Sequence, residues 1–188
     1  MSKAATDIAQ AIEAVLPNVA NIYLKPADNN SNDERFLKGS LSEEVVYEHG
    51  NQFKVNWETG QKTGFFLDQR DNRELLGQYV QGKRVLNAFC YSGGFSIAAK
   101  LAGATEVTAV DLDEKAIEMA KRNMNLNNVR IDFVHSDAFT WIRQMQKNGK
   151  TWDLVLCDPP KFVDSRDEEF EAEGLKKYND LNVLAMQV

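Results

Sequence analysis

The residues best suited to chemistry form the segment Asp158-Pro159-Pro160-Lys161-Phe162, which directly follows the apolar run 154–157. Such a run predicts a buried strand of a parallel sheet. The prolines end it, because neither can donate to a strand ladder and each fixes φ near about −65°. Asp158 is therefore expected at the carboxyl end of a central strand, where open α/β sheets bind ligands. A rigid acidic corner suits the edge of a nucleobase, although an ordinary proline-rich turn has the same pattern.

A second candidate site is the loop Phe89-Cys90-Tyr91-Ser92-Gly93-Gly94, between an apolar run and a helical segment. Glycines let a ligand approach the backbone, and the following helix offers its free amides. The spacing does not fit the G-x-G-x-x-G fingerprint of NAD and FAD sites, and the loop lacks the Lys-Ser/Thr ending of a phosphate-binding loop. A tight strand-to-helix turn is the alternative interpretation.

Acidic residues follow the next two predicted strands. Asp111 comes about 20 residues after the glycine loop, where a carboxylate holds the hydroxyls of a ribose. Leu112 beside it is suited to packing on an adenine face. Asp137, followed by Ala138, could accept a hydrogen bond from an adenine amino group, and equally could cap the next helix. Together with Asp158, these positions describe a nucleoside cofactor without phosphates.

The elements that must position these residues alternate strictly from residue 84 onward. Strands are predicted at 84–89, 106–110, 131–135 and 152–157, and helices at 95–102, 113–126, 138–147 and 175–188, with Asp113 as an N-cap. Repeated strand–helix units predict an α/β fold with a doubly wound parallel sheet and right-handed crossovers. We therefore expect a Rossmann-like core over residues 58–188, stopping after its fourth strand.

Residues 1–57 are predicted to form an amino-terminal α+β segment. The pattern indicates a helix at 4–16, a strand at 21–25, a polar loop at 26–40, and a hairpin of strands 44–48 and 52–57. Beyond it, residues 65–68 read as a short strand and 69–80 as a helix. His49 falls in the hairpin turn and has no apparent partner ligands, so no metal site is predicted.

Composition excludes several classes of protein. The 188 residues carry a net charge of −6, with 43% hydrophobic and 27% charged residues, as in ordinary globular proteins. No apolar run approaches the about 20 residues of a membrane span, and no signal-peptide core is present. The two isolated cysteines do not indicate disulfides, so we expect a cytoplasmic protein without a membrane partner. The acidic charge means that RNA binding would require a local patch or another domain.

The combination of strand-end residues resembles the class I S-adenosylmethionine-dependent methyltransferases. Segments 62–70, 85–96 and 158–162 are similar to signatures of a bacterial family that methylates C5 of cytosine in large-subunit ribosomal RNA, and the similarity runs from about residue 40 to the end. The resemblance implies S-adenosyl-L-methionine as cofactor and ribosomal RNA as substrate. The implied cofactor-binding residues are Thr63, Gly64, Gln69, Arg70, Phe89, Tyr91, Ser92, Gly93, Gly94, Asp111, Leu112, Asp137, Ala138 and Asp158, with Asp158-Pro159-Pro160-Lys161-Phe162 as the substrate-base corner.

Methylation at C5 implies a thiolate that adds to C6 of the base. Neither cysteine of this chain is expected to serve. Strand alternation points Cys157 away from Asp158, and Cys90 is expected to pack in its loop. The family's catalytic cysteine follows a fifth strand, and its members carry an amino-terminal RNA-binding PUA domain. Since neither feature is present, we expect a fragment of a longer enzyme that binds cofactor weakly or not at all and does not turn over alone.

Two further expectations concern assembly and alternative functions. An uncovered fourth strand, 152–157, would favour dimerisation or strand swapping. N-methylation of guanine or adenine is an alternative activity, although Lys161 stands where such enzymes place an aromatic residue. A non-catalytic nucleotide- or RNA-binding module is disfavoured by the acidic charge, and a dehydrogenase by the glycine spacing.

Overall fold

A computed structural model describes residues 3–25, 35–40, 43–57, 60, 64–163 and 168–188. The chain divides into two compact units. The smaller contains residues 1–45 and 55–66, and the larger contains 46–54 and 67–188. No helix among these residues has both the length and the apolar character needed to cross a membrane.

The smaller unit contains the helix α1 (Lys3–Val15) and the antiparallel strands β1 (Ile22–Leu24) and β2 (Arg35–Lys38). The prediction of a loop over residues 26–40 was wrong for 35–38, whereas 26–34 lie outside the described residues. Strand β2 forms because Phe36 pairs with Tyr23 across the ladder, with ring centroids 5.0 Å apart. Such cross-strand aromatic pairs stabilise short strands.

The predicted hairpin is confirmed as β3 (Glu43–Glu48) and β4 (Asn51–Asn56). Its two-residue turn consists of His49 and Gly50, with φ angles of 49° and 82°. Positive φ at both positions is the type I′ pattern, which matches the twist of paired strands. Residues 46–54 of this hairpin belong to the larger unit, where the Phe53 side chain is fully buried.

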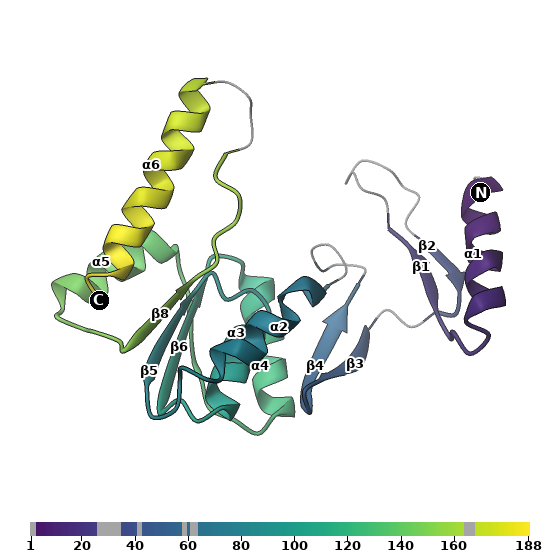
Figure 1. Ribbon diagram of the computed structural model, residues 1–188, viewed down its shortest axis with the longest axis horizontal. Helices are drawn as coiled ribbons and strands as arrows, with labels where there is room; N and C mark the ends of the chain where they lie inside the picture. The colour runs from purple at the N-terminus through teal and green to yellow at the C-terminus, as the bar shows by residue number, and fades with distance from the viewer. Residues whose placement is uncertain (1–2, 26–34, 41–42, 58–59, 61–63, 164–167) are drawn as a thin grey trace. The chain divides into compact units, whose positions relative to one another are not determined.

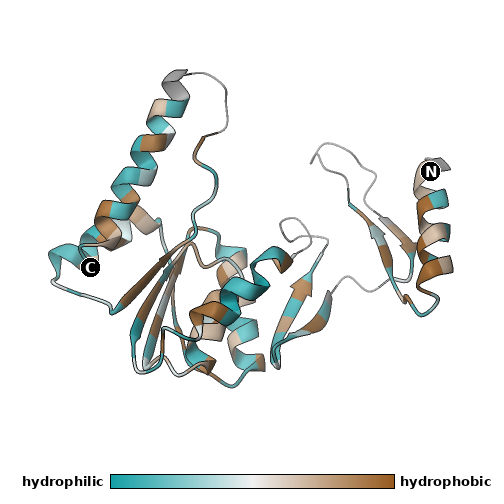
Figure 2. Ribbon diagram, in the orientation of Figure 1, coloured by the Kyte–Doolittle hydropathy of each residue, from teal (hydrophilic) through white to brown (hydrophobic). Residues whose placement is uncertain are grey.

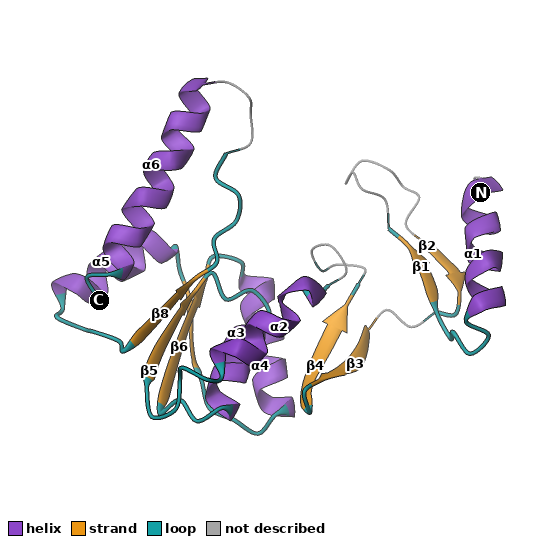
Figure 3. Ribbon diagram, in the orientation of Figure 1, coloured by secondary structure: helices purple, strands orange, loops and turns teal. Residues whose placement is uncertain are grey.

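The larger unit is built on a parallel sheet with the strand order β7-β6-β5-β8 (Figures 1 and 3). Its strands are β5 (Arg84–Ala88), β6 (Glu106–Asp111), β7 (Asp132–His135) and β8 (Leu154–Cys157). Its helices are α2 (Arg70–Leu76), α3 (Gly94–Leu101), α4 (Glu114–Leu126), α5 (Ala138–Lys147) and α6 (Glu168–Ala185), with the 3-10 helix η1 (Leu67–Gln69) before α2. The predicted Rossmann-like α/β fold is confirmed.

Helices cover both faces of this sheet, with α3 and α4 on one side and α5 and α6 on the other (Figure 1). Strand β5 shows how alternation produces the two faces. Leu86 and Ala88 pack in the apolar cluster of α5 and α6, whereas Asn87 bonds to Ser96 of α3. The central strands are mostly apolar, and the exposed helix surfaces are polar (Figure 2). For β5, burial on both faces is what its apolar run indicated. The expectation of a buried central strand was wrong for β8 within the described residues, because β8 is the last strand of the sheet and its four residues are only partly buried.

Three predicted elements differ from the observed structure. Residues 65–68 form no strand, because Gly64 turns the chain at φ 80° and Leu67–Gln69 then form η1. The helix predicted over 69–80 is shorter, since α2 ends at Leu76 before Gly77. In contrast, α6 begins at Glu168 rather than near residue 175, as the strong helix formers Glu and Ala extend it despite Gly174.

Candidate cofactor-binding site

The segments that follow the four parallel strands leave the sheet at one edge. Ala88 is level with Val110 of β6 and with Cys157 of β8, and Asp111 is level with His135 of β7. The following segments, 89–93, 112–113, 136–138 and 158–160, therefore start from the same edge. Strand β5 lies between β6 and β8, so the strand order reverses there, which is where open α/β sheets bind ligands.

The glycine loop has an unusual backbone. Phe89, Tyr91 and Gly93 all lie in the left-handed region, with φ angles of 62°, 47° and 82°. For a residue with a side chain this conformation costs about 1–2 kcal/mol. Such strain persists only where the surroundings hold it, and it concentrates at functional sites. The loop is therefore held in a shape that its own sequence does not favour.

Gly93 cannot be replaced without moving its neighbours. A Cβ atom on Gly93 would lie 3.1 Å from the Cβ of Ala120 on α4 and 3.4 Å from the Phe133 ring. Its positive φ also favours glycine. Behind the loop, the amide nitrogen of Asn87 donates to the Ser96 hydroxyl at 2.8 Å, with both residues buried. These contacts fix the start of α3 against β5 and α4.

The carboxylate of Asp111 joins the glycine loop to the tip of β6. Its Oδ2 accepts from the Tyr91 backbone N–H at 2.7 Å, and its Oδ1 accepts from the Asp113 N–H at 2.9 Å. A carboxylate has about four acceptor positions, so it retains capacity for ribose hydroxyls. Leu112, between the two acids, is 67% exposed, as a surface for packing on a purine would require.

Two helix caps and one side-chain contact hold the segments that follow β6 and β7. Asp137 caps α5 by accepting from the Thr140 N–H at 2.8 Å, and Ala138 is buried. His135 Nε2 lies 2.9 Å from the Leu112 carbonyl oxygen, which ties the tips of β6 and β7 together. Asp113 caps α4 as predicted, accepting from Lys115 N–H at 2.9 Å. Capping leaves acceptor capacity on Asp137 for an adenine amino group.

The segment after β8 presents exposed polar groups on an aromatic support. Asp158, Pro160 and Lys161 are exposed. The Phe162 ring lies 6.3 Å from Phe89 and 5.9 Å from Phe139, measured between centroids. The same ring lies 4.8 Å from the Tyr178 ring, whose hydroxyl accepts from the Phe162 N–H at 3.2 Å. This cluster joins the glycine loop to residues 158–162, which we call the Asp158 corner.

Neither cysteine has the properties of a nucleophile. Burial, reinforced by the negative charge of Asp111, raises the pKa of the Cys90 thiol. Burial alone raises the pKa of Cys157. A nucleophilic cysteine needs a thiolate, and therefore an environment that lowers the pKa. Both observations agree with the expectation that these thiols pack.

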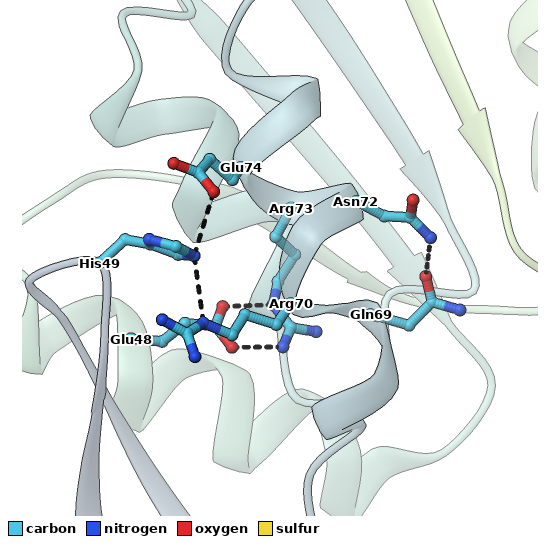
Figure 4. A network of polar contacts seen from close by, with 7 residues as sticks. All are labelled: Glu48, His49, Gln69, Arg70, Asn72, Arg73 and Glu74. Atoms are coloured by element: carbon cyan, nitrogen blue, oxygen red, sulfur yellow. Dashed lines mark hydrogen bonds and ion pairs between the residues drawn. The ribbon is translucent and has the colours of Figure 1, made fainter.

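The other candidate residues lie apart from the strand tips in sequence. Thr63 lies outside the described residues, and Gly64 belongs to the smaller unit, so their approach to a cofactor stays a prediction. Gln69 and Arg70 lie at the start of α2 and make local contacts, to Asn72 at 2.7 Å and to His49 at 3.4 Å respectively (Figure 4). Their proposed role at the cofactor also stays a prediction.

Sequence reasoning missed a residue that touches the glycine loop. Asn123 on α4 is fully buried, and its amide nitrogen donates to the Ser92 carbonyl at 3.1 Å. The available signal was an asparagine on the helix face defined by Ala116 and Ala120, where an apolar residue is expected. A buried polar residue in such a position requires hydrogen-bond partners.

Comparison with known proteins is consistent with this geometry. Residues 24–168 match the family described as S-adenosylmethionine-dependent methyltransferase. Ribosomal RNA large subunit methyltransferase I of Shewanella amazonensis is 42% identical over 147 residues, covering 77% of this chain and 37% of the relative. The protein of the same name from Pseudoalteromonas atlantica is 42% identical over 156 residues, covering 81% and 39%. The chain thus spans about two fifths of the length of these curated relatives.

The fold also has a close counterpart among solved structures. The crystal structure of SMU.776, assigned as a methyltransferase and complexed with SAH (S-adenosylhomocysteine), superposes with a TM-score of 0.84 at 29% identity. The match covers 99% of this chain and 49% of that one. With the family match over most of its length, these similarities lead to one conclusion: the chain belongs to the S-adenosylmethionine-dependent methyltransferase family.

Proposed function

We propose that the protein represented by this chain transfers a methyl group from S-adenosylmethionine to C5 of a cytosine in large-subunit ribosomal RNA. The observation that supports this most is the similarity, at 42% identity over 147 residues, to a ribosomal RNA large subunit methyltransferase I. The family match over residues 24–168 spans both the glycine loop and the Asp158 corner.

The strand tips fit such a cofactor. In our proposal, Asp111 accepts from the ribose hydroxyls, Leu112 packs on the adenine, and Asp137 with Ala138 borders the adenine edge. The loop residues Tyr91 to Gly94 hold the methionine portion. The exposed Leu112 and the remaining acceptor capacity of Asp111 support these roles. The cofactor supplies a methyl group on a sulfonium, and the protein's contribution is alignment.

The Asp158 corner is proposed to recognise the target base. Asp158 and Lys161 present charged groups there, and two prolines limit their motion. Reaction at C5 by the thiolate route needs a cysteine with a lowered pKa, whereas the pKa values of Cys90 and Cys157 are both raised. We therefore propose that the nucleophilic cysteine is supplied from outside these 188 residues, and that this chain alone holds cofactor weakly without turnover.

Two experiments test this function. Calorimetric titration of SAH into the chain should detect weak, saturable binding that is lost in Asp111→Ala. The matched control is Asp132→Ala, which removes an exposed acid from the opposite end of the sheet and should leave binding unchanged. Equal binding by all three proteins would contradict the assigned site.

The substrate specificity can be tested by deleting the gene that encodes the protein. Deleting it from its source organism should remove one 5-methylcytidine from large-subunit ribosomal RNA, measured by nucleoside mass spectrometry and site mapping. Complementation with the intact gene should restore the modification. Loss of an N-methylated guanine or adenine instead would exclude the C5 assignment while retaining RNA methylation.

We also infer a tendency to self-associate. Within the described residues, β8 pairs only with β5, so its outer edge exposes strand hydrogen-bonding groups. Such edges pair with other chains. Light scattering over a concentration series should show a dimer of this chain, and a monodisperse monomer throughout would contradict the inference.

A further inference from the structure

Two asparagine side chains, Asn123 of α4 and Asn127 directly after its last residue, bind the outer edge of the hairpin as a neighbouring strand would. Asn127 accepts from the Gln52 N–H at 2.9 Å and donates to the Gln52 carbonyl at 2.6 Å. Asn123 accepts from the Lys54 N–H at 2.6 Å. Gln52 and Lys54 are two residues apart and present their backbone groups to the same edge of β4. Asn123 and Asn127 are four residues apart and project from the same side of the helix, so each asparagine can reach one of the two strand residues.

Asn123 also reaches the glycine loop. Its side-chain oxygen serves β4, and its nitrogen donates to the Ser92 carbonyl at 3.1 Å. The residue is fully buried, and Ser92 is 3% exposed, so water cannot replace these bonds. One turn earlier on α4, Ala120 limits the space at Gly93. A single amide therefore spans the hairpin and the loop, whereas among the described residues the Asn127 side chain bonds to Gln52 and to the Asn123 backbone carbonyl, at 2.8 Å, and not to the loop.

We propose that Asn123 is a positioning residue that couples docking of the hairpin to the conformation of the cofactor loop. Its donor bond holds the loop in the left-handed conformation that Tyr91 and Gly93 adopt at a cost. Loss of that bond leaves a buried carbonyl without this donor, which is costly. The consequence for ligand binding rests on the proposed role of this loop at the cofactor.

The chain offers a closely matched pair of variants. Asn123→Asp keeps the acceptor for the Lys54 N–H but places a carboxylate oxygen against the Ser92 carbonyl. Asn127→Asp makes the same chemical change one turn away. It disturbs the bonds to Gln52 and to the Asn123 backbone carbonyl, and it leaves the side-chain amide of Asn123 and its bond to the loop in place. Lys54→Pro tests the coupling from the hairpin side, because it removes the N–H that bonds to Asn123, and an outer strand edge tolerates proline.

Hydrogen exchange of individual amides, measured by NMR without ligand, reports directly on the stability of the hydrogen bonds in the loop. In Asn123→Asp, the Tyr91 and Gly93 amides should exchange about tenfold faster or more, as expected from the loss of a buried hydrogen bond. These amides normally donate to Asp111 at 2.7 Å and to the Cys90 carbonyl at 2.9 Å. Lys54→Pro should accelerate the same amides, whereas Asn127→Asp should accelerate the Gln52 amide and change the loop by less than about twofold.

Titration with SAH then tests the consequence for binding. Asn123→Asp should weaken SAH binding about tenfold or more, and Asn127→Asp by less than about twofold. Unchanged loop exchange in both Asn123→Asp and Lys54→Pro overturns the coupling, and equal effects of the two asparagine variants also overturn it. Failure of the unaltered chain to bind SAH would instead count against the cofactor role of the loop, while the exchange data would still decide the role of Asn123.

Discussion

Replacing Arg73 by methionine is expected to destabilise the larger unit by about 3–5 kcal/mol, the cost of leaving one partner of a buried ion pair alone. Arg73 Nε and Nη2 each donate to a different oxygen of Glu48 at 2.6 Å (Figure 4). The two side chains are only 3% and 7% exposed. The guanidinium carbon also lies 5.8 Å from the Phe95 ring centroid. The pair joins the end of β3 to α2.

This loss is a large part of the about 5–15 kcal/mol that stabilises a typical domain. Urea unfolding, followed by circular dichroism and tryptophan fluorescence, should therefore show a markedly lower midpoint. Trp141 and Trp152, whose ring centroids are 5.5 Å apart, report on the larger unit. The double variant Glu48→Leu with Arg73→Met should recover most of the loss, because no charge then remains buried.

An exposed ion pair provides the control. Lys177 lies 3.0 Å from Glu173 on α6, with exposures of 51% and 61%. Lys177→Met should change the free energy of unfolding by less than about 1 kcal/mol. The reasoning would be refuted if Arg73→Met cost no more than this control, or if the double variant were no more stable than Arg73→Met alone.

Three further predictions concern the site and the sheet. Gly93→Ala should destabilise by about 1–2 kcal/mol from its left-handed backbone alone, seen in urea midpoints, and should also weaken SAH binding because the methyl group meets Ala120. Cys90 should resist iodoacetamide at neutral pH, because burial and the charge of Asp111 raise its pKa, and rapid alkylation of the folded chain seen by mass spectrometry would contradict this. The pKa of Asp153 is lowered, chiefly by the hydrogen bond that its carboxylate accepts from the Arg84 N–H. The ionised carboxylate therefore contributes its full stabilisation above the pKa of the unfolded chain, about 3.9. This stabilisation is lost as the pH falls through the lower pKa of the folded protein. Asp153→Asn should flatten this acid-side decrease in urea midpoint, and an unchanged pH profile would disprove the assignment.

The parallel sheet and its strand-tip residues could be predicted because their signals are local and repeated. Each apolar run ends at a polar residue or glycine, and parallel strands place such ends on one edge. Register in the structure brings Asp111 level with His135 and Ala88 level with Cys157, so the separate segments start from one edge. The sequence pattern was therefore sufficient to predict the parallel sheet and to indicate the candidate residues that follow its strands.

Features that depend on tertiary partners were not predictable in this way. The strand β2 needs Phe36 to pair with Tyr23 across a long connection, and the polar sequence before it indicates a loop. Phe65 and Phe66 read as a strand, but a glycine with positive φ precedes them and η1 follows. The role of Asn123 becomes visible only when Lys54 and Ser92 are brought to α4.

The most direct test of the account is to map SAH onto the chain by amide chemical shifts. In ¹H–¹⁵N NMR spectra of the titrated chain, we expect the largest changes at residues 91–94, 111–113, 137–138 and 158, all at the carboxyl edge of the sheet. These changes should disappear in Asp111→Ala while its spectrum remains that of a folded protein. Changes confined to the opposite edge, near Lys83, Thr105 and Asp153, or no changes at any SAH concentration, would contradict the assigned site.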